Sequence, residues 1–121
     1  MKTQKELKEA YKQKKFRIGV FQIRNLVNGK ILVASSLNLD AIWNRTRMEL
    51  NFGGYRNEAL QAEWKELGET GFAFEILSEL TQKEDDSTDY SKEVRELEKL
   101  YIDELQPFDK KGYHKLRLPY P

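Results

Sequence analysis

One acidic residue stands out for the chemistry that its position would allow. Glu98 falls within an expected helix from Tyr90 to Leu105, four residues after Val94 and three before Tyr101. This spacing places Glu98 at the edge of the buried stripe of the helix, not on its outer face. Such a carboxylate either binds a metal ion beside the sheet, or reaches solvent and pairs with a lysine or arginine. The sequence leaves both possibilities open.

Other kinds of site find little support in the chain. His114 is the one histidine in 121 residues, which excludes a multi-histidine metal site and a relay between two imidazoles. The absence of cysteine excludes thiolate ligands, a cysteine nucleophile and a disulfide framework. The Gly53-Gly54 pair lacks the lysine and hydroxyl that a P-loop needs, and no serine lies in a nucleophile-elbow motif.

Charge is distributed unevenly along a chain whose formal net charge is only +1. The segment from Met1 to Arg17 holds seven basic and two acidic residues, whereas Gln82 to Glu104 holds nine acidic and four basic residues. Both segments are typical of solvated surfaces. The alternative for the first is a basic arm beside a nucleic-acid site, because clustered lysine and arginine neutralise phosphates.

Length and hydropathy favour one small domain in the cytoplasm. The chain is long enough to bury a single core. Neither an apolar signal region near Met1 nor a run long enough to cross a membrane occurs, so we expect no membrane association. We therefore expect a basic N-terminal helix or arm at residues 1–15 and one domain over residues 16–121.

Three segments are predicted to form strands. Phe16 to Arg24 carries apolar side chains on both faces, which is typical of a strand that is covered on two sides. Asn28-Gly29 then predicts a tight hairpin turn with positive φ at both residues, followed by a second strand from Lys30 to Ala34. Phe72 to Leu77 alternates as a third strand.

Helices are expected before, between and after these strands. Helical spacing predicts them at Thr3 to Lys14, from about Leu39 to Leu50 with Ser36 or Asn38 as cap, at Asn57 to Leu67, and at Tyr90 to Leu105. The inward positions are Leu39, Ile42, Trp43, Thr46 and Leu50, then Leu60, Trp64 and Leu67, then Val94, Leu97, Tyr101 and Leu105. This order predicts an α+β fold, a small three-stranded antiparallel sheet flanked by helices on both faces.

Short motifs from Gly19 to His114 add a family resemblance. They are Gly19-Val20-Phe21, Asn28-Gly29-Lys30, Leu32-Val33-Ala34, Asn38-Leu39, Trp43, Leu60, Trp64, Gly71-Phe72, Glu98 and Gly112-Tyr113. In this order and spacing the chain resembles the GIY-YIG nuclease superfamily, of bacterial and phage type. That superfamily includes the catalytic domains of phage homing endonucleases and the first domain of the excision-repair incision subunit.

The resemblance implies a phosphodiester hydrolase, and the chain departs from it at most reactive positions. Family members use a tyrosine to help deprotonate water, an arginine to stabilise charge at phosphorus, and a glutamate to hold a divalent ion. By position, Glu98 matches the metal-binding glutamate. The other matched positions are Phe21 and Leu32 for two tyrosines, Ala34 for a glycine, Ile42 for the arginine, Thr46 for a histidine and His114 for an asparagine.

These departures favour a domain that binds without cutting. Losing a charge-stabilising group costs about a hundred- to a thousandfold in rate, and losing a general base costs roughly a hundredfold or more. We therefore expect no nuclease activity, no cofactor, and a nucleic-acid or protein partner. The candidate nucleic-acid contacts are Lys12, Lys14, Lys15, Arg17, Arg45 and Arg47.

Two alternatives remain open at this point. One is a divergent endonuclease that uses Mg²⁺ or Mn²⁺ on Glu98, with Arg45, Tyr55, Tyr113 or His114 in relocated catalytic roles. The other is a structural subunit of a larger assembly. One structural feature distinguishes these hypotheses. It is whether four side chains converge on an open cleft or are packed together without one: Phe21, Leu32, Ile42 and Glu98.

Overall fold

A computed structural model describes residues 16–83 and 88–115 of the chain. The expected N-terminal helix or arm, with Lys12, Lys14 and Lys15, lies outside the described residues. So do residues 84–87 of the acidic segment and residues 116–121 of the tail.

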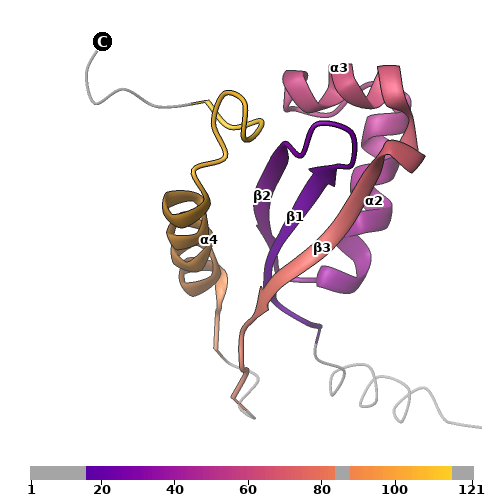
Figure 1. The fold of residues 1–121 in the computed structure, drawn as a ribbon. Helices are drawn as coiled ribbons and strands as arrows, with labels where there is room; N and C mark the ends of the chain where they lie inside the picture. Colours follow the sequence, from indigo (N-terminus) through magenta and orange to yellow (C-terminus); the bar gives the residue numbers. More distant parts are fainter. Residues whose placement is uncertain (1–15, 84–87, 116–121) are drawn as a thin grey trace, which may run out of the picture.

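The sheet has three antiparallel strands, as predicted. They are β1 (Gly19–Asn25), β2 (Ile31–Ser36) and β3 (Phe72–Glu79), in the order β2-β1-β3 (Figure 1). The first strand begins three residues later than expected: Ile18 lies just beyond the last pair with β3, and Arg17 bonds to the start of the next helix. Ile18 O accepts the Leu80 N–H at 2.7 Å, and Arg17 O accepts the Leu39 N–H at 2.8 Å.

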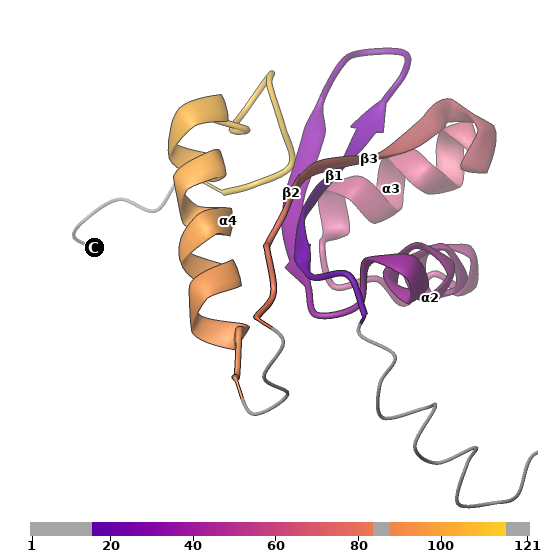
Figure 2. The same cartoon turned by 90° about the horizontal axis from the view of Figure 1, so that it is seen from below.

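Helices cover both faces of this sheet, which confirms the α+β fold class. The helices α2 (Leu39–Phe52) and α3 (Glu58–Leu67) lie on one face, and α4 (Ser91–Leu105) lies on the other (Figure 2). A short 3₁₀ turn, η1 (Glu69–Gly71), connects α3 to β3 and was not predicted from the sequence. The central strand β1 is therefore buried on two sides, as its apolar pattern indicates.

Each face of the sheet has its own hydrophobic core. The core under α2 and α3 contains Phe21, Ile23, Leu32, Leu39, Leu50, Leu60, Trp64, Phe72 and Tyr113. The core under α4 contains Ile18, Val20, Val33, Tyr90 and Val94. Successive strand residues alternate between the two cores because strand side chains point to opposite faces.

The start of α2 settles a choice that the sequence left open. Asn38 is the cap, and its side-chain oxygen accepts the Ala41 N–H at 3.2 Å. The Ser36 hydroxyl instead accepts the Asn38 N–H at 2.9 Å. Trp43 then packs on the sheet as expected, with its ring stacked on Phe74 at 5.3 Å.

The hairpin loop differs from the expected tight turn. It spans four residues from Leu26 to Gly29, closed by a 2.8 Å bond from Asn25 N to Lys30 O. Only Gly29 within it has positive φ, at 78°, so the prediction of positive φ at Asn28 was wrong. The physical reason is the side chain of Asn25, which accepts the N–H groups of Val27 and Asn28 and thereby shapes a wider loop.

The outer edge of β2 is covered by residues 107–115, here called the closing segment. Ile31 N donates to Lys111 O at 3.1 Å, and Tyr113 N donates to Ile31 O at 3.0 Å. Asn57 at the start of α3 also holds this segment, since its side-chain amide donates to Tyr113 O at 3.0 Å. The closing segment thus connects β2 with α3.

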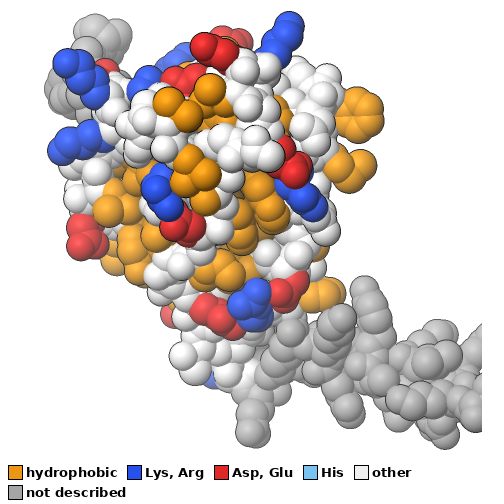
Figure 3. Space-filling model, turned by 45° about the vertical axis from the view of Figure 1, so that its right-hand side comes forward, with side chains coloured by type: hydrophobic (Ala, Val, Ile, Leu, Met, Phe, Trp, Pro, Cys, Tyr) orange, Lys and Arg blue, Asp and Glu red, His pale blue; other side chains and the backbone are white. Residues whose placement is uncertain are grey.

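Basic and acidic side chains alternate on the face that carries β3. Figure 3 shows hydrophobic side chains gathered across this face, with blue basic groups beside red acidic ones. The ion pairs of the described residues include Arg17 with Asp40 at 2.6 Å, Arg24 with Glu75 at 2.7 Å, and Arg47 with Glu69 at 3.5 Å. Among the described helices, none is both long and apolar enough to cross a membrane.

Candidate functional site

Three neighbouring hollows form one cleft between β2, the α2–α3 loop, α4 and the closing segment. The first, of about 340 Å³, and the second, of about 310 Å³, share Ala34, Tyr55 and Arg56. The second and the third, of about 690 Å³, share Arg56, Asn57 and His114. We call these the α2 hollow, the central hollow and the closing-segment hollow.

The floor of the cleft is apolar at the two positions that the sequence resemblance matches to tyrosines. Phe21 lines the α2 hollow and Leu32 lines the central hollow, and both belong to the core, with 2 % and 5 % of their surface exposed. Ala34, Ile42 and Thr46 line the same two hollows. The cleft is therefore open, but its floor offers no phenol at these two positions.

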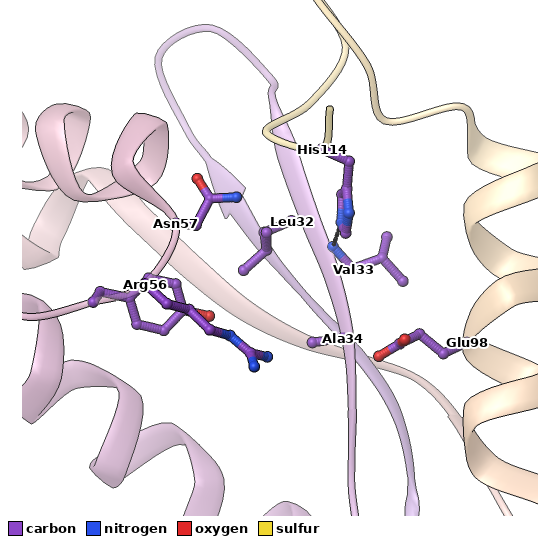
Figure 4. A pocket seen from close by; sticks show the side chains of 8 residues that line it. Leu32, Val33, Ala34, Arg56, Asn57, Glu98 and His114 are labelled. Carbon is purple, nitrogen blue, oxygen red and sulfur yellow. Dashed lines mark hydrogen bonds between the residues drawn. The ribbon is translucent and has the colours of Figure 1, made fainter. Parts of the chain in front are cut away.

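Glu98 reaches the central hollow from α4, as its place at the edge of the helix stripe predicts. Its half-buried carboxylate points toward Ala34 on β2 (Figure 4). No ion pair of Glu98 occurs within the described part of the chain, where the six ion pairs involve other carboxylates. The carboxylate is thus available to a ligand.

The side chains around Glu98 could give a metal ion only a few protein ligands. Residues 16–83 and 88–115 contain no group of three or more histidine, aspartate or glutamate side chains that could hold one. Mg²⁺ nevertheless often takes one or two carboxylates and completes its shell with water and phosphate oxygens. In the central hollow such an ion would have Glu98 as a single carboxylate ligand, with water completing its shell.

His114 lies in the same hollow with one ring nitrogen already engaged. Its Nε2 accepts the Val33 N–H at 2.9 Å, so the imidazole completes the hydrogen bonding of the β2 edge (Figure 4). Burial lowers the pKa of His114 below 6.5, although the nearby Glu98 opposes this shift. A neutral ring that accepts through Nε2 has no free lone pair there for proton abstraction.

The His114 environment predicts how stability depends on pH. Below about pH 6.5 the unfolded chain binds a proton at His114 that the folded chain resists, so folding should weaken on acidification toward pH 5. Urea unfolding of the wild type and of His114→Gln, compared at about pH 7.5 and pH 5.5, measures this. The variant should show a smaller decline. An equal decline in both proteins would assign the effect to other groups.

Tyr113 is held away from the central hollow by a buried polar network. Its hydroxyl donates to the Glu63 carboxylate, and Asn25 Nδ2 lies 3.0 Å from the hydroxyl and 2.9 Å from Glu63 Oε2. Burial, followed by the bond to Glu63, raises the pKa of Tyr113 well above its usual value. This phenol therefore serves the fold, and the structure does not bring it to Glu98.

Arg45 and Tyr55 do line the cleft. Arg45 lies in the α2 hollow and pairs with Glu49 at 3.2 Å, one helical turn along α2. Tyr55 borders both the α2 and the central hollow, and burial raises the pKa of its phenol, while Arg56 opposes that shift partly through a hydrogen bond. Of the two, Tyr55 is the one that lies in the same hollow as Glu98.

The other two described candidates for nucleic-acid contact lie elsewhere. Arg17 pairs with Asp40 and Glu79, at 2.6 and 3.9 Å. Arg47 pairs with Glu69 and lies over the Trp43 ring, 5.6 Å from its centroid. Neither residue lines any of the three hollows.

Arg56 is the cleft residue that the sequence did not single out. It lines all three hollows and comes from the loop between α2 and α3, directly before the cap residue Asn57. A lone arginine in a loop carries no periodic or motif signal. Only the folded arrangement places it opposite Glu98, with Ala34 of β2 between them (Figure 4).

Comparison with known proteins supports the fold seen in these elements. No protein-family model and no curated protein matches the chain. Two solved structures do match: the catalytic domain of the homing endonuclease I-TevI, and a single-residue mutant of the catalytic domain of that intron endonuclease. The first is 27% identical, with a TM-score of 0.65, and the match covers 79% of this chain and 95% of that one.

The mutant structure matches the chain to a similar extent. It is 25% identical, with a TM-score of 0.64, over 75% of this chain and 86% of that one. Together with the strand order and the two helical layers, these matches agree with the fold expected from the motifs between Gly19 and His114. The chain has a GIY-YIG-like fold.

Proposed function

We propose that this GIY-YIG-like domain binds nucleic acid in its cleft without cutting it. The observation that supports the proposal is the apolar floor of the α2 and central hollows. Phe21 and Leu32 belong to the core, and Ile42 lines the α2 hollow where the family places an arginine. A cytoplasmic setting, which the sequence favours, is part of the proposal.

The remaining polar groups support the loss of cleavage. The Tyr113 hydroxyl bonds to Glu63, His114 Nε2 accepts from Val33, and Arg45 pairs with Glu49. Each group therefore has a structural partner in place of a reacting atom. A missing charge stabiliser and a missing general base together lower the rate by about ten-thousandfold or more.

Binding itself is supported by the fold and by the shape of the cleft. The matched structures are endonuclease catalytic domains, and the three joined hollows give this chain an elongated groove. Its lining is balanced in charge, with Lys30, Arg45, Arg56 and Lys115 against Glu49, Glu58, Glu98 and Asp109. We therefore expect binding of moderate affinity that weakens steeply as salt rises.

A cleavage and binding experiment tests the proposal. Purified chain is incubated with supercoiled plasmid, branched DNA and RNA in Mg²⁺ or Mn²⁺, and binding to the same short nucleic acids is followed by fluorescence anisotropy. We expect binding at low salt and no nicking. Glu98→Gln should bind a few times more tightly, because one carboxylate charge is removed from the cleft.

The competing outcome belongs to a second candidate function, a divergent metal-dependent nuclease. Glu98, His114, Tyr55 and Arg56 all line the central hollow, and this convergence favours it. That candidate requires metal-dependent nicking that Glu98→Gln abolishes, which would overturn the proposal. Absence of binding to every nucleic acid, together with recovery of a stable protein complex, would favour a protein-binding or structural role instead.

A further inference from the structure

Arg56 occupies a unique place among the side chains that line the cleft. It is exposed and borders the α2, central and closing-segment hollows at once. In Figure 4 its guanidinium extends toward Ala34, whereas the Glu98 carboxylate approaches Ala34 from the opposite side. A ligand that follows the cleft from either end therefore passes Arg56.

The charge of Arg56 is also left without a carboxylate partner in the described structure. Arg17, Arg24, Arg45 and Arg47 each form an ion pair with an aspartate or glutamate. The described partner of Arg56 is the neutral hydroxyl of Tyr55. An unneutralised guanidinium is the stronger anion ligand, because no internal carboxylate has to be displaced first.

We propose that Arg56 is the phosphate contact of the cleft and supplies there the cation that Ile42 cannot. The inference rests on the proposed nucleic-acid binding, and it names the residue that contacts the phosphate backbone of the nucleic acid. The phosphate lies between the guanidinium of Arg56 and the apolar side chains of Leu32 and Ala34. Guanidinium suits this role because its planar N–H groups bond two phosphate oxygens at once.

The position of the phosphate also explains how Glu98 is tolerated in a nucleic-acid cleft. Arg56 and Glu98 approach from opposite sides of Ala34 and form no ion pair with each other. A phosphate bound on the Arg56 side keeps Ala34 between its charge and the carboxylate.

Three variants test the inference through the salt dependence of binding. Arg56→Gln removes both the charge and the planar guanidinium. Arg56→Lys keeps the charge but loses the guanidinium. Arg95→Gln is the control and removes one positive charge from the exposed surface of α4. Anisotropy titrations use a short fluorescein-labelled DNA duplex and its separate strands over a series of salt concentrations. Thermal unfolding of each variant verifies that the fold is retained.

Arg56→Gln should weaken binding about tenfold and reduce the slope of log K against log salt by about 0.9 on the duplex. Arg56→Lys should fall between this variant and the wild type, and Arg95→Gln should change neither quantity appreciably. Equal effects of Arg56→Gln and Arg95→Gln would overturn the inference while leaving the proposed nucleic-acid binding intact.

A second readout separates the two proposals when no oligonucleotide binds. The Nε–H resonance of Arg56, assigned by its loss in Arg56→Gln, is followed by NMR during titration with inorganic phosphate. A saturable shift of this resonance, without a shift of Arg95, would support the phosphate contact even if the wider proposal fails. No shift at low ionic strength would overturn it.

Discussion

Replacing Asn25 with alanine should lower the free energy of unfolding by about 3 kcal/mol, one of the largest effects expected for a single polar residue here. Asn25 is 0 % exposed, and its side chain makes four hydrogen bonds. Its oxygen accepts from the Val27 and Asn28 backbone, and its amide donates to Glu63 and Tyr113. Alanine leaves these groups without their partner, and the bond to Tyr113 among them is fully buried.

Chemical denaturation with a matched variant makes this result specific. Asn28→Ala removes an exposed asparagine from the same loop, and solvent replaces its bonds to Glu63 and Lys30. We expect its cost to stay below about 1 kcal/mol. Similar losses in both variants would mean that loop conformation, and not the buried network, sets the stability of this region.

Gly19→Ala should destabilise the domain by about 3 kcal/mol for a purely steric reason. A Cβ at Gly19 would lie 2.9 Å from the Glu79 Cα and closer still to the Ser78 carbonyl oxygen. These are backbone atoms of the neighbouring strand β3, so rotation of a side chain cannot relieve the overlap. The irregular register between Val20 and Phe21 lies directly beside this contact.

Gly54→Ala is the matched control for this prediction. A Cβ at Gly54 meets no atom within 4 Å, and its backbone does not need positive φ. Thermal or urea unfolding should therefore place Gly54→Ala within about 0.5 kcal/mol of the wild type. A comparable loss at both glycines would contradict the steric explanation, because the lower entropy of the unfolded chain favours alanine at both positions.

The elements and their layers could be predicted because local patterns determine them. Apolar residues on both faces of the first strand, and helical stripes such as that of Val94, Leu97 and Tyr101, each indicate a burial direction without knowledge of distant contacts. The length of the hairpin loop could not be predicted from such local patterns. Its length depends on the buried Asn25 side chain, and a polar residue at the end of a strand does not reveal that it will be buried.

The cleft was predictable only in part, for a related reason. Glu98 could be placed because a single helix fixes its direction. Arg56 could not, since its approach to Ala34 depends on how α2, α3 and the sheet pack together. The network of Asn25, Glu63 and Tyr113 joins residues that are 38 and 88 positions apart in the chain, so no local pattern identifies it.

The closing segment has a consequence for how copies of this protein meet. An edge strand with free N–H and C=O groups can recruit a strand from another molecule and so begin aggregation. Along β2 this route is blocked at Ile31 by the backbone of Lys111 and Tyr113, and at Val33 by the imidazole of His114. A second molecule that pairs with this edge at Val33 has to displace the same histidine that borders the cleft, so self-association there would disturb the ligand site.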